Sequence, residues 1–565
     1  MKLKSILNTL IQDAFDKANI TQKPLAVSEA TKPEFGDYQF NGAMALSKQL
    51  KQNPRAIATQ IIEALDLSTA IIKAEIAGPG FINLWLNPLW VAKACEEARE
   101  DKRLGIALRS QGQKVVVDYS GPNMAKQMHV GHLRSTIIGD TLANLLEFLG
   151  DEVIRQNHIG DWGTQFGMLI AYLEEKQSDG EMKLEDLEVF YKNAKKRFDE
   201  DASFADKARE YVVKIQGGDS HCLSLWQSFI ERSLGHCEEV YSKLNVKLSR
   251  EDVRAESFYN EDLAQVITDL DQAKLLEVSQ GAKCVFLEGD ENPIIVQKGD
   301  GGYLYATTDL SALRYRAKTL EADRIAYVVD ARQASHFKQV FNLAKKANFV
   351  GENVRLEHIG FGTMMDKGGK PFKTRDGGTV KLIDLLDEAV IKAQETIRNA
   401  EDYTAQELTN KAKIIGIGAL KYADLSMNRE SNYIFSWEKM LSLEGNTSVY
   451  MLYAYARIQS IFRKHNAKIE GKIIITEALE HSLSVLLLRF EDVLERASID
   501  ASPHQITSYL YDLASLFMRF YEHCPILKEG ISQESKQSRL ALADLTAKTI
   551  KQGLDILGIE VVQKL

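Results

Sequence analysis

The chain has 565 residues, 45% of them apolar and 26% charged, which is the composition of an ordinary globular protein. A single hydrophobic core stops growing near ~250–300 residues, so we expect two to four domains. The 79 acidic residues outnumber the 70 basic ones, giving a formal net charge of −9, which excludes the profile of a general nucleic-acid binder. An enzyme that acts on nucleic acid is not excluded, because phosphate contacts need only local basic patches. Taken alone, the charge favours a metabolic enzyme.

The cysteine and apolar patterns narrow the class of protein. The five cysteines include no C-x-x-C pair, so we expect reduced, mostly buried thiols and no metal site of that kind. No run of about 18 apolar residues occurs, and the amphipathic first residues lack the apolar core and cleavage site of a signal peptide. The sequence therefore predicts no membrane span and a cytoplasmic location.

Residues 1–110 are expected to form a small α+β module. Helical periodicity covers residues 1–18 and about 39–65. Residues 71–87 have the pattern of two strands joined by a Gly-Pro-Gly turn.

A new pattern begins at residue 114. Residues 114–120 (KVVVDYS) have the apolar, β-rich pattern of a strand buried in a parallel sheet. After a polar loop, residues 133–150 show helical periodicity and end on Gly150, and residues 152–160 again resemble a strand. Strand, helix and strand predict a right-handed βαβ unit.

The rest of the chain divides into three parts. Residues from about 165 to 250 are charged and helical, which predicts an insertion. Nearly every segment from about 385 to the end is helical, which predicts an all-α C-terminal region. Between these parts, strands that complete the α/β sheet are expected over residues 283–297, 303–308, 324–330 and 354–362. The predicted domains are therefore 1–110, 111–385 and 386–565.

The strongest local signal is the run His129-Val130-Gly131-His132, placed between the first predicted strand of the sheet and its helix. A helix N-terminus offers unpaired N–H groups to phosphate, and open α/β sheets bind ligands at this turn. Gly131 lets a nucleotide approach the backbone, and two imidazoles can donate hydrogen bonds to departing pyrophosphate. Two ordinary histidines at a helix start are one alternative. A zinc site is another, although no nearby cysteine or third histidine completes it.

Residues 122–140 (PNMAKQMHVGHLRSTIIGD) resemble the HIGH region of class I aminoacyl-tRNA synthetases, in the form typical of the arginine enzymes. The resemblance spans residues 30 to 565, and the joint order of its motifs is highly specific. The further matching segments are NHIGDWGTQFG (157–167), YLYATTDLSALRYR (303–316), VVDARQASHFKQVF (328–341), HIGFGTMM (358–365), KPFKTRDGGTVKL (370–382), YMLYAYARIQS (450–460) and FMRFYEHCPIL (517–527).

The resemblance implies a multidomain α/β protein. Its parts would be a small N-terminal α+β tRNA-binding module, a Rossmann-type parallel-sheet catalytic domain, and an all-α C-terminal region with an anticodon-binding domain. The implied activity joins L-arginine to tRNA(Arg) through an arginyl-adenylate made from ATP and Mg²⁺, with no tightly bound cofactor. We expect a monomer that binds neither DNA nor membrane.

An arginine pocket needs a planar acceptor, because a carboxylate grips a guanidinium with two parallel hydrogen bonds. Tyr305 and Asp309 are four residues apart where a predicted strand leads into a helix, and the resemblance makes them the guanidinium readers. Without it, Asp309 would be a helix N-cap and Tyr305 a core residue. The resemblance also assigns Asp118 to the guanidinium, and Asn123 and Gln333 to the α-amino and carboxylate end of the substrate.

The ATP site implied by the resemblance surrounds the same loop. His129, His132 and Gly131 would contact the phosphates, and Asp330, at a strand end, would bind the ribose. The remaining residues of the implied ATP site are Pro122, Asn123, Gly362, Lys373 and Arg375.

The second signature loop departs from the family pattern. Class I enzymes usually carry KMSKS, whose later lysine neutralises the triphosphate, but here the stretch is FKTRDGG over residues 372–378. A missing cation costs rate unless another replaces it. Lys126, three residues before His129, is the predicted substitute, with Lys373 and Arg375 as alternatives; a solvated lysine is the simpler interpretation.

Two surfaces are expected to contact tRNA. Tyr450, Tyr453 and Arg457 share one face of a predicted helix, and aromatic rings beside a guanidinium suit unpaired anticodon bases. A core stripe with a snorkelling arginine is the alternative. In the N-terminal module, Phe81 and Asn83 alternate along one strand, and the resemblance implies that they contact a base of the tRNA elbow.

Two other functions compete with the arginine-specific synthetase. A synthetase of another specificity or a small nucleotidylyltransferase can share H-x-G-H, but a small enzyme would lack the flanking module and helical tail. A non-catalytic tRNA-binding protein would be expected to have lost His129, His132 or Asp309, and all three are present.

Overall fold

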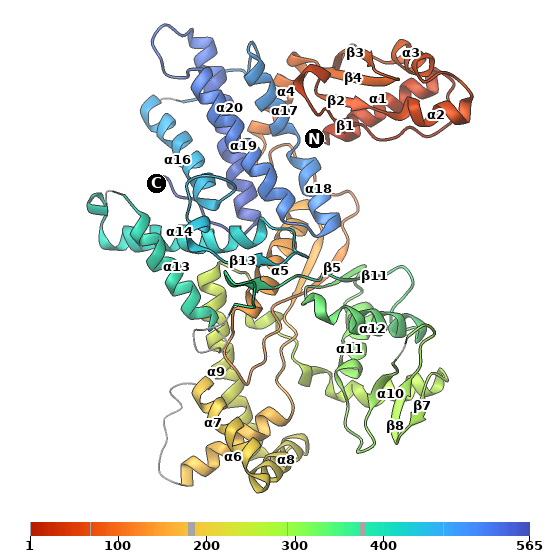
Figure 1. Cartoon of the computed structure of the whole chain (residues 1–565), viewed down its shortest axis with the longest axis vertical. Coiled ribbons are helices and arrows are strands. Elements are labelled where there is room, and N and C mark those ends of the chain that lie inside the picture. Colours follow the sequence, from red (N-terminus) through yellow and green to blue (C-terminus); the bar gives the residue numbers. More distant parts are fainter. Residues whose placement is uncertain are drawn as a thin grey trace. The chain divides into compact units, whose positions relative to one another are not determined.

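The computed structural model describes residues 2–67, 69–178, 187–290, 292–372, 380–398, 400–466 and 468–565. The chain divides into two compact units (Figure 1). Unit 1 holds Met1–Leu108, Ser442–Asp555 and Glu560–Leu565, and unit 2 holds Arg109–Leu441 with Ile556–Ile559. These units are defined by packing, and the three domains expected from the sequence stay a prediction.

A four-stranded parallel sheet forms the centre of unit 2, in the order β11-β10-β5-β6. Its strands are β5 (Lys114–Asp118), β6 (Glu152–Gln156), β10 (Arg324–Tyr327) and β11 (Arg355–His358). Val115, Val116 and Val117 are fully buried, as expected for a strand covered on both faces. In register, Asp118 pairs with both Gln156 and Tyr327, so the carboxyl ends of three strands meet at one edge.

Helices of the expected βαβ kind flank this sheet. α5 (Gly131–Leu149) follows β5 and ends on Gly150, whose φ of 101° is the left-handed conformation that glycine supplies at helix ends. α11 (Tyr305–Arg314) and α12 (Ala334–Lys346) lie side by side, and Leu310, Leu313 and Val340 join Ile325 of β10 in one hydrophobic core. The predicted Rossmann-type parallel sheet is therefore confirmed.

The predicted strands at 283–297 and 303–308 do not complete that sheet. β7 (Glu277–Ser279), β8 (Ala282–Val285) and β9 (Ile294–Gln297) form a separate antiparallel sheet, joined by hairpin-like turns. Tyr303 forms a single bridge to Gln297, and the chain then enters α11 at Tyr305. The strand prediction at 303–308 was wrong because alternating aromatic residues there begin a buried helix.

The predicted helical insertion is confirmed as helical. It contains α6 (Thr164–Ser178), α7 (Leu187–Glu200), α8 (Ala202–Gln216) and α9 (Ser220–Leu244), and α10 (Asn260–Gln272) follows. Unit 2 continues beyond the predicted boundary near residue 385 through the following elements. These are β12 (Met364–Met365), α13 (Leu382–Thr396), α14 (Ala405–Leu425), β13 (Tyr433–Ile434) and α15 (Trp437–Met440).

The N-terminal part of unit 1 is the expected α+β module. Its sheet has the order β1-β2-β4-β3, and the predicted hairpin is β3 (Ile71–Ala77) with β4 (Phe81–Leu86). The predicted helix over about 39–65 was wrong in detail: its first residues are in a strand, and Lys51, with φ of 53°, separates two helices. The other elements are α1 (Leu3–Lys17), β1 (Ser28–Glu29), β2 (Tyr38–Phe40), α2 (Gly42–Leu50), α3 (Pro54–Ala64) and α4 (Pro88–Glu100).

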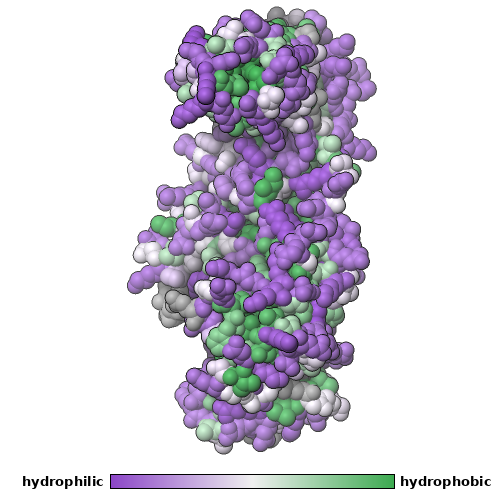
Figure 2. All heavy atoms as spheres, turned by 90° about the vertical axis from the view of Figure 1, so that its right-hand side faces the viewer, coloured by the Kyte–Doolittle hydropathy of each residue, from purple (hydrophilic) through white to green (hydrophobic). Residues whose placement is uncertain are grey.

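The C-terminal part of unit 1 is a helix bundle, as predicted. Its helices are α16 (Ser448–His465), α17 (Ala478–Leu488), α18 (Phe490–Asp500), α19 (His504–His523) and α20 (Gln533–Ile556). It packs on the N-terminal module, where Nε2 of His481 lies 3.0 Å from Oδ1 of Asp37. Within the described ranges, no helix is long and apolar enough to cross a membrane. Figure 2 shows one face that is mainly hydrophilic, with apolar residues gathered in separate patches.

Candidate active site

The signature loop connects the carboxyl end of β5 to the first turn of α5. Gly131 is the first residue of the helix, and a Cβ placed on it would lie 2.7 Å from Cε1 of His129. Any other residue would force the His129 imidazole to shift, so glycine preserves the position of the ring as well as access to the backbone. The predicted phosphate loop therefore has the expected position at a helix N-terminus.

Backbone amides fix the tautomer of both imidazoles. The N–H of Gly131 donates to Nδ1 of His129 at 3.0 Å, and the N–H of His129 donates to Nδ1 of His132 at 3.1 Å. Because Nδ1 is the acceptor in each ring, the proton of each neutral imidazole lies on Nε2. The two ring centroids are 4.0 Å apart, so the loop offers a pair of adjacent Nε2–H donors.

His132 is a neutral donor at physiological pH. Burial, with a smaller contribution from neighbouring His129, lowers the pKa of His132 to about 3. A neutral imidazole can hydrogen-bond a phosphate oxygen, but it adds no positive charge to the departing pyrophosphate. His132 therefore does not supply the charge neutralisation.

The second signature loop is anchored beside the first. The N–H of Val130 donates to the carbonyl of Val380 at 3.1 Å, and the N–H of Leu382 donates to the carbonyl of Met128 at 2.9 Å. Residues 373–379 lie outside the described residues, and with them the candidates Lys373 and Arg375. The flank that follows them thus joins the turn that carries both histidines.

Lys126, the predicted substitute cation, has an exposed side chain. Its Nζ lies 4.5 Å from the centre of the Tyr191 ring on α7, a cation–π contact. The contact holds the ammonium by an aromatic face of the helical insertion. Contact between the ammonium of Lys126 and the phosphates of ATP stays a prediction.

Asp118, at the end of β5, is paired inside the protein. Its Oδ2 accepts a hydrogen bond from the guanidinium of Arg316 at 2.8 Å, and its Oδ1 accepts the backbone N–H of His158 at 3.2 Å. Arg316 is fully buried and also donates to Oε1 of Gln156 at 2.6 Å. The guanidinium of Arg316 therefore binds the carboxylate that the resemblance assigned to the guanidinium of the substrate. Contact of Asp118 with substrate arginine stays a prediction.

Asp309 lies within α11, one helical turn after Tyr305. The helix is preceded by Leu304, so Asp309 is not its N-cap, and that alternative was wrong. Tyr305 is 73% exposed, so the alternative of a core tyrosine was also wrong. Oδ2 of Asp309 lies 2.6 Å from Nε2 of His336 on α12. Tyrosine, carboxylate and imidazole are thus gathered where α11 meets α12.

Two carboxylates near Asp309 were missed by the sequence analysis. Burial and repulsion from Asp161 and Asp309 raise the pKa of Glu256 to about 7. Burial also raises the pKa of Asp161, whose Oδ1 accepts the N–H of Ser257 at 2.9 Å. A raised carboxyl pKa beside other acids marks a surplus of negative charge that a cation would relieve. The spacing of these acids along the chain gave no signal, because folding alone brings them together.

The same cluster reaches Asp118. Burial lowers the pKa of His158, and the charges of Asp118 and Asp309 oppose this effect. Burial raises the pKa of Tyr327, and these two carboxylates add to the rise. The carboxylates assigned to the guanidinium therefore act on the same pair of buried side chains.

The remaining predicted site residues lie at the carboxyl ends of the strands. Oδ1 of Asn123 caps the loop by accepting the N–H of Ala125 at 3.0 Å, and Asn123 forms a bridge to Gly160. Gln333 is exposed at the start of α12, Pro122 is buried, and Gly362 donates its N–H to the carbonyl of Arg429 at 2.8 Å. None of these positions conflicts with the predicted roles, which stay predictions.

Asp330 already has a partner. Its Oδ2 lies 2.8 Å from the guanidinium of Arg332, and its Oδ1 accepts the N–H of the same residue at 2.9 Å. Burial opposes ionisation, but the hydrogen bonds from Arg332 hold the pKa of Asp330 below its usual value. Because Arg332 is exposed, a ribose hydroxyl could replace it, and that role stays a prediction.

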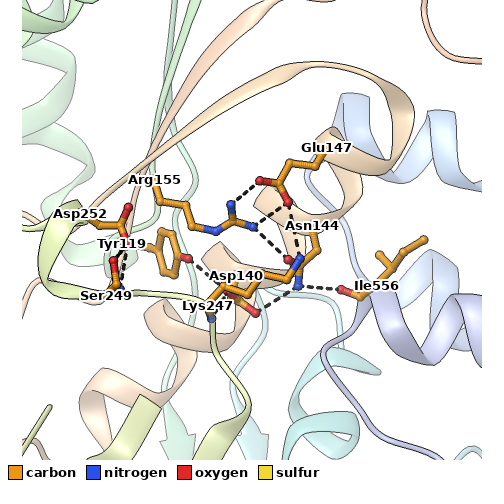
Figure 3. A network of polar contacts seen from close by, with 9 residues as sticks. All are labelled: Tyr119, Asp140, Asn144, Glu147, Arg155, Lys247, Ser249, Asp252 and Ile556. Atoms are coloured by element: carbon orange, nitrogen blue, oxygen red, sulfur yellow. Dashed lines mark hydrogen bonds and ion pairs between the residues drawn. The ribbon is translucent and has the colours of Figure 1, made fainter. Parts of the chain in front are cut away.

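A buried polar network supports the loop from the other end of α5 (Figure 3). The hydroxyl of Tyr119 donates to Oδ1 of Asp140 at 3.1 Å, and the amide of Asn144 donates to Oδ2 at 3.1 Å. Asn144 also donates to the carbonyl of Ile556 at 3.4 Å, while Arg155 pairs with Glu147. These contacts join β5, α5, β6 and the segment 556–559 of the same unit, and so they fix the helix that carries the histidines.

The predicted tRNA surfaces lie in unit 1. On α16, the guanidinium of Arg457 donates to the hydroxyl of Tyr453 at 2.5 Å and lies 5.4 Å from the ring of Tyr521. Tyr450 is half-buried, with its ring 5.8 Å from Tyr511. The residues therefore form part of an aromatic cluster between α16 and α19 and keep some accessible surface.

On β4, Asn83 is buried and its Oδ1 accepts a hydrogen bond from the amide of Gln39 at 2.7 Å. Phe81 lies half-buried at the start of the same strand. Base contacts by Phe81 and Asn83 stay predictions. Among the residues that the structure describes, no group of three or more His, Cys, Asp or Glu side chains could hold a metal ion.

Comparisons with known proteins agree with this geometry. Residues 96–437 match the family model of the class I (R) tRNA synthetase catalytic domain. Residues 2–86 match the arginyl-tRNA synthetase N-terminal domain, and residues 451–565 match the DALR anticodon-binding domain. The fold and the signature loop thus define a class I tRNA synthetase.

Whole-chain relatives specify the family. The chain is 54% identical to an arginine–tRNA ligase of Alteromonas mediterranea and 52% identical to one of Cellvibrio japonicus, in each case over 100% of both chains. The structure of the arginyl-tRNA synthetase of Plasmodium falciparum superposes with a TM-score of 0.87 and 31% identity over 100% of both chains. The chain belongs to the arginyl-tRNA synthetase family.

Proposed function

We propose that this chain joins L-arginine to tRNA(Arg) for protein synthesis, in two steps and with ATP. The observation that carries the proposal is the cluster of carboxylates around Asp309, in a unit that also holds a loop with two Nε2–H donors. Family membership over the whole chain supports the same activity. One side of the site suits a guanidinium, and the other suits a triphosphate.

In the first step, an α-carboxylate oxygen of arginine attacks the α-phosphorus of ATP. The bond from this phosphorus to the bridging oxygen breaks, and pyrophosphate leaves with the Mg²⁺ that entered with ATP. His129 and His132 donate hydrogen bonds to phosphate oxygens, and Lys126 supplies the positive charge that the neutral His132 lacks. The protein mainly positions groups and neutralises developing charge.

In the second step, a terminal ribose hydroxyl of tRNA attacks the carbonyl carbon of the adenylate, and AMP leaves. In class I relatives this group is the 2′-hydroxyl. Tyr450, Tyr453 and Arg457 contact anticodon bases, while Phe81 and Asn83 contact the tRNA elbow. We propose that the enzyme acts as a cytoplasmic monomer with three sequence domains, 1–110, 111–385 and 386–565.

The arginine pocket reads charge and shape together. Asp309 accepts two parallel hydrogen bonds from the substrate's guanidinium, and Tyr305, one turn earlier, lies against the same group. Asn123 and Gln333 hold the α-amino and carboxylate end. Glu256 and Asp161 add negative potential, and the pKa of Glu256 falls when a guanidinium binds nearby. Lysine cannot reproduce the planar pair, so it is rejected without an editing site.

The test is ATP–pyrophosphate exchange with each of the twenty amino acids, with and without tRNA(Arg). We expect arginine alone to support exchange, and only when tRNA is present. Exchange with another amino acid would favour a synthetase of different specificity. Binding of tRNA without any exchange or charging would favour a non-catalytic tRNA-binding protein.

A further inference from the structure

His336 is held against the carboxylate that reads the substrate. Nε2 of His336 lies 2.6 Å from Oδ2 of Asp309, and both side chains are largely shielded, with 33% and 15% of their surfaces exposed. His336 is the third residue of α12, whose N-cap is Gln333, a predicted contact of the substrate's other end. The imidazole therefore bonds to one predicted arginine contact and follows another by three residues along the chain.

The bond uses one acceptor position of Oδ2, so both oxygens of Asp309 can still accept a hydrogen bond from a ligand. In the described part of the chain, this is the one side-chain contact that the structure gives Asp309, whereas Asp118 has a partner on each oxygen. A neutral imidazole that donates Nε2–H to Oδ2 orients the carboxylate plane and keeps its charge. A protonated imidazole donates the same bond but forms an ion pair that cancels the charge.

The groups around His336 act on the pKa of its imidazole in opposite directions. The hydrogen bond and charge of Asp309 raise the pKa of His336, and burial opposes this rise. The positive end of α12 also disfavours a cation at the third residue. The elements around α12 carry the following titratable or charged groups: Tyr305, Asp309 and Arg314 on α11, Asp330 and Arg332 on the preceding turn, Arg324 and Tyr327 on β10, Arg355, Glu357 and His358 on β11, and Lys338, Lys345 and Lys346 on α12 itself.

We propose that His336 is a positioning residue of the arginine pocket, which holds Oδ2 of Asp309 and makes arginine binding compete with a proton on the imidazole. This inference rests on the proposed role of Asp309 in binding the guanidinium. With neutral His336, the guanidinium meets a pre-oriented, fully charged carboxylate. With protonated His336, the guanidinium meets an ion pair and a second cation, so binding expels the imidazole proton to solvent.

The competition predicts the direction in which the arginine KM changes with pH. Below the pKa of His336 in the free enzyme, binding of one arginine releases one proton, so the arginine KM rises up to about tenfold for each pH unit lost. Above that pKa the KM is flat. A residue that only filled space would leave the KM without this slope.

His336→Gln separates the two roles, because its amide donates a hydrogen bond but cannot be protonated. We expect the variant to keep an arginine KM within about threefold of the parent at pH 8 and to lose the rise toward pH 6. His336→Ala removes the donor, so its arginine KM should rise about tenfold at pH 8 with the ATP KM unchanged. Aminoacylation of tRNA(Arg), measured at both pH values, gives these constants.

His221→Gln is the matched control, since Nε2 of His221 lies 3.0 Å from Oε1 of Glu174 in the helical insertion. It should keep the parent pH profile. A His336→Gln profile that still rises like the parent, or a His336→Ala KM equal to the parent at pH 8, overturns the inference. If Asp309→Asn leaves the arginine KM unchanged, the proposed function of Asp309 fails instead, and the two failures are thereby distinguished.

Discussion

Asp118 and Asp309 were both assigned to the guanidinium of arginine, but the fold treats them differently. Asp118 lies at a strand end, where the fully buried Arg316 and a backbone N–H bind its two oxygens. Asp309 lies on a helix and is bonded to one largely shielded imidazole, that of His336. The first carboxylate is committed to a permanent cation of the protein, and the second is held by a partner whose charge can be removed.

The difference teaches that residue type and strand-end position do not make a carboxylate available to a ligand. A buried guanidinium needs a partner at all times, because an unpaired charge in the interior is costly. A histidine needs none when it is neutral. Asp118 is therefore bound to Arg316 within the protein, and Asp309 is the better candidate for direct contact with the substrate.

The largest effect expected from this comparison concerns stability. Asp118→Ala leaves Arg316 buried without its carboxylate, so we expect a loss of about 3–5 kcal/mol in the free energy of unfolding. Asp309→Ala should cost less than about 1 kcal/mol, because its partner can become neutral. Urea unfolding of both variants measures the difference, and equal losses would remove the distinction between the two acids.

The next effect concerns binding. Asp309→Asn removes a charged bidentate acceptor, so the arginine KM should rise at least about 100-fold with the ATP KM unchanged. Steady-state aminoacylation checks both constants. An unchanged arginine KM would mean that Asp309 has no contact with the substrate.

The sequence predicted the frame of this site, but not its electrostatics. The strand predicted over 114–120, the helix that ends on Gly150 and the H-x-G-H turn follow from local patterns, namely an apolar run, a glycine stop and a fixed spacing. The strand expected over 303–308 failed because helix and strand compete for a short aromatic run, and tertiary packing decides between them.

The partners Arg316, His336 and Glu256 could not be found from spacing. Arg316 pairs with a residue 198 positions away, and His336 with one 27 positions away, across elements that only the fold brings together. Tyr305 was assigned to the arginine pocket by resemblance, and the structure shows that its side chain is exposed. Local sequence patterns predict the strand, the helix and the signature turn, whereas the charge pairs of the site depend on contacts between residues far apart in the sequence.

At the signature loop, both imidazoles are donors and His132 is neutral. Here we expect an effect on rate comparable in size to the effect of Asp309→Asn on the arginine KM. Lys126→Ala should lower kcat for pyrophosphate exchange about 10²-fold, with the arginine KM little changed, as for a contact made mainly in the transition state. Tyr191→Leu removes the ring under the ammonium and should change kcat much less. Near-full kcat in Lys126→Ala would assign the charge to Lys373, Arg375 or Mg²⁺.

His132 makes the stability of the protein depend on pH. The folded state resists protonation of His132 until about pH 3, while the unfolded chain takes up the proton near 6.5. The unfolded state therefore binds more protons between these values, so stability falls as pH decreases, by at most about 1.4 kcal/mol per unit. His132→Gln should flatten this loss between pH 6.5 and 5 in urea unfolding, and a slope equal to the parent would contradict it.

The smallest effect is expected on α16, where Tyr453 keeps accessible surface beside Arg457. Tyr453→Ala should raise the tRNA KM about tenfold, in the range of one lost base stack, and leave arginine and ATP constants unchanged. Tyr455→Phe, on the buried side of the same helix, is the control for packing. An unchanged tRNA KM would favour a purely structural tyrosine.

The most direct test of the account is a crystal structure of the protein with L-arginine and a non-hydrolysable ATP analogue. The account predicts the guanidinium within hydrogen-bond distance of both oxygens of Asp309, with Arg316 still paired to Asp118. A guanidinium bound to Asp118, with Arg316 displaced and Asp309 bonded only to His336, would contradict it.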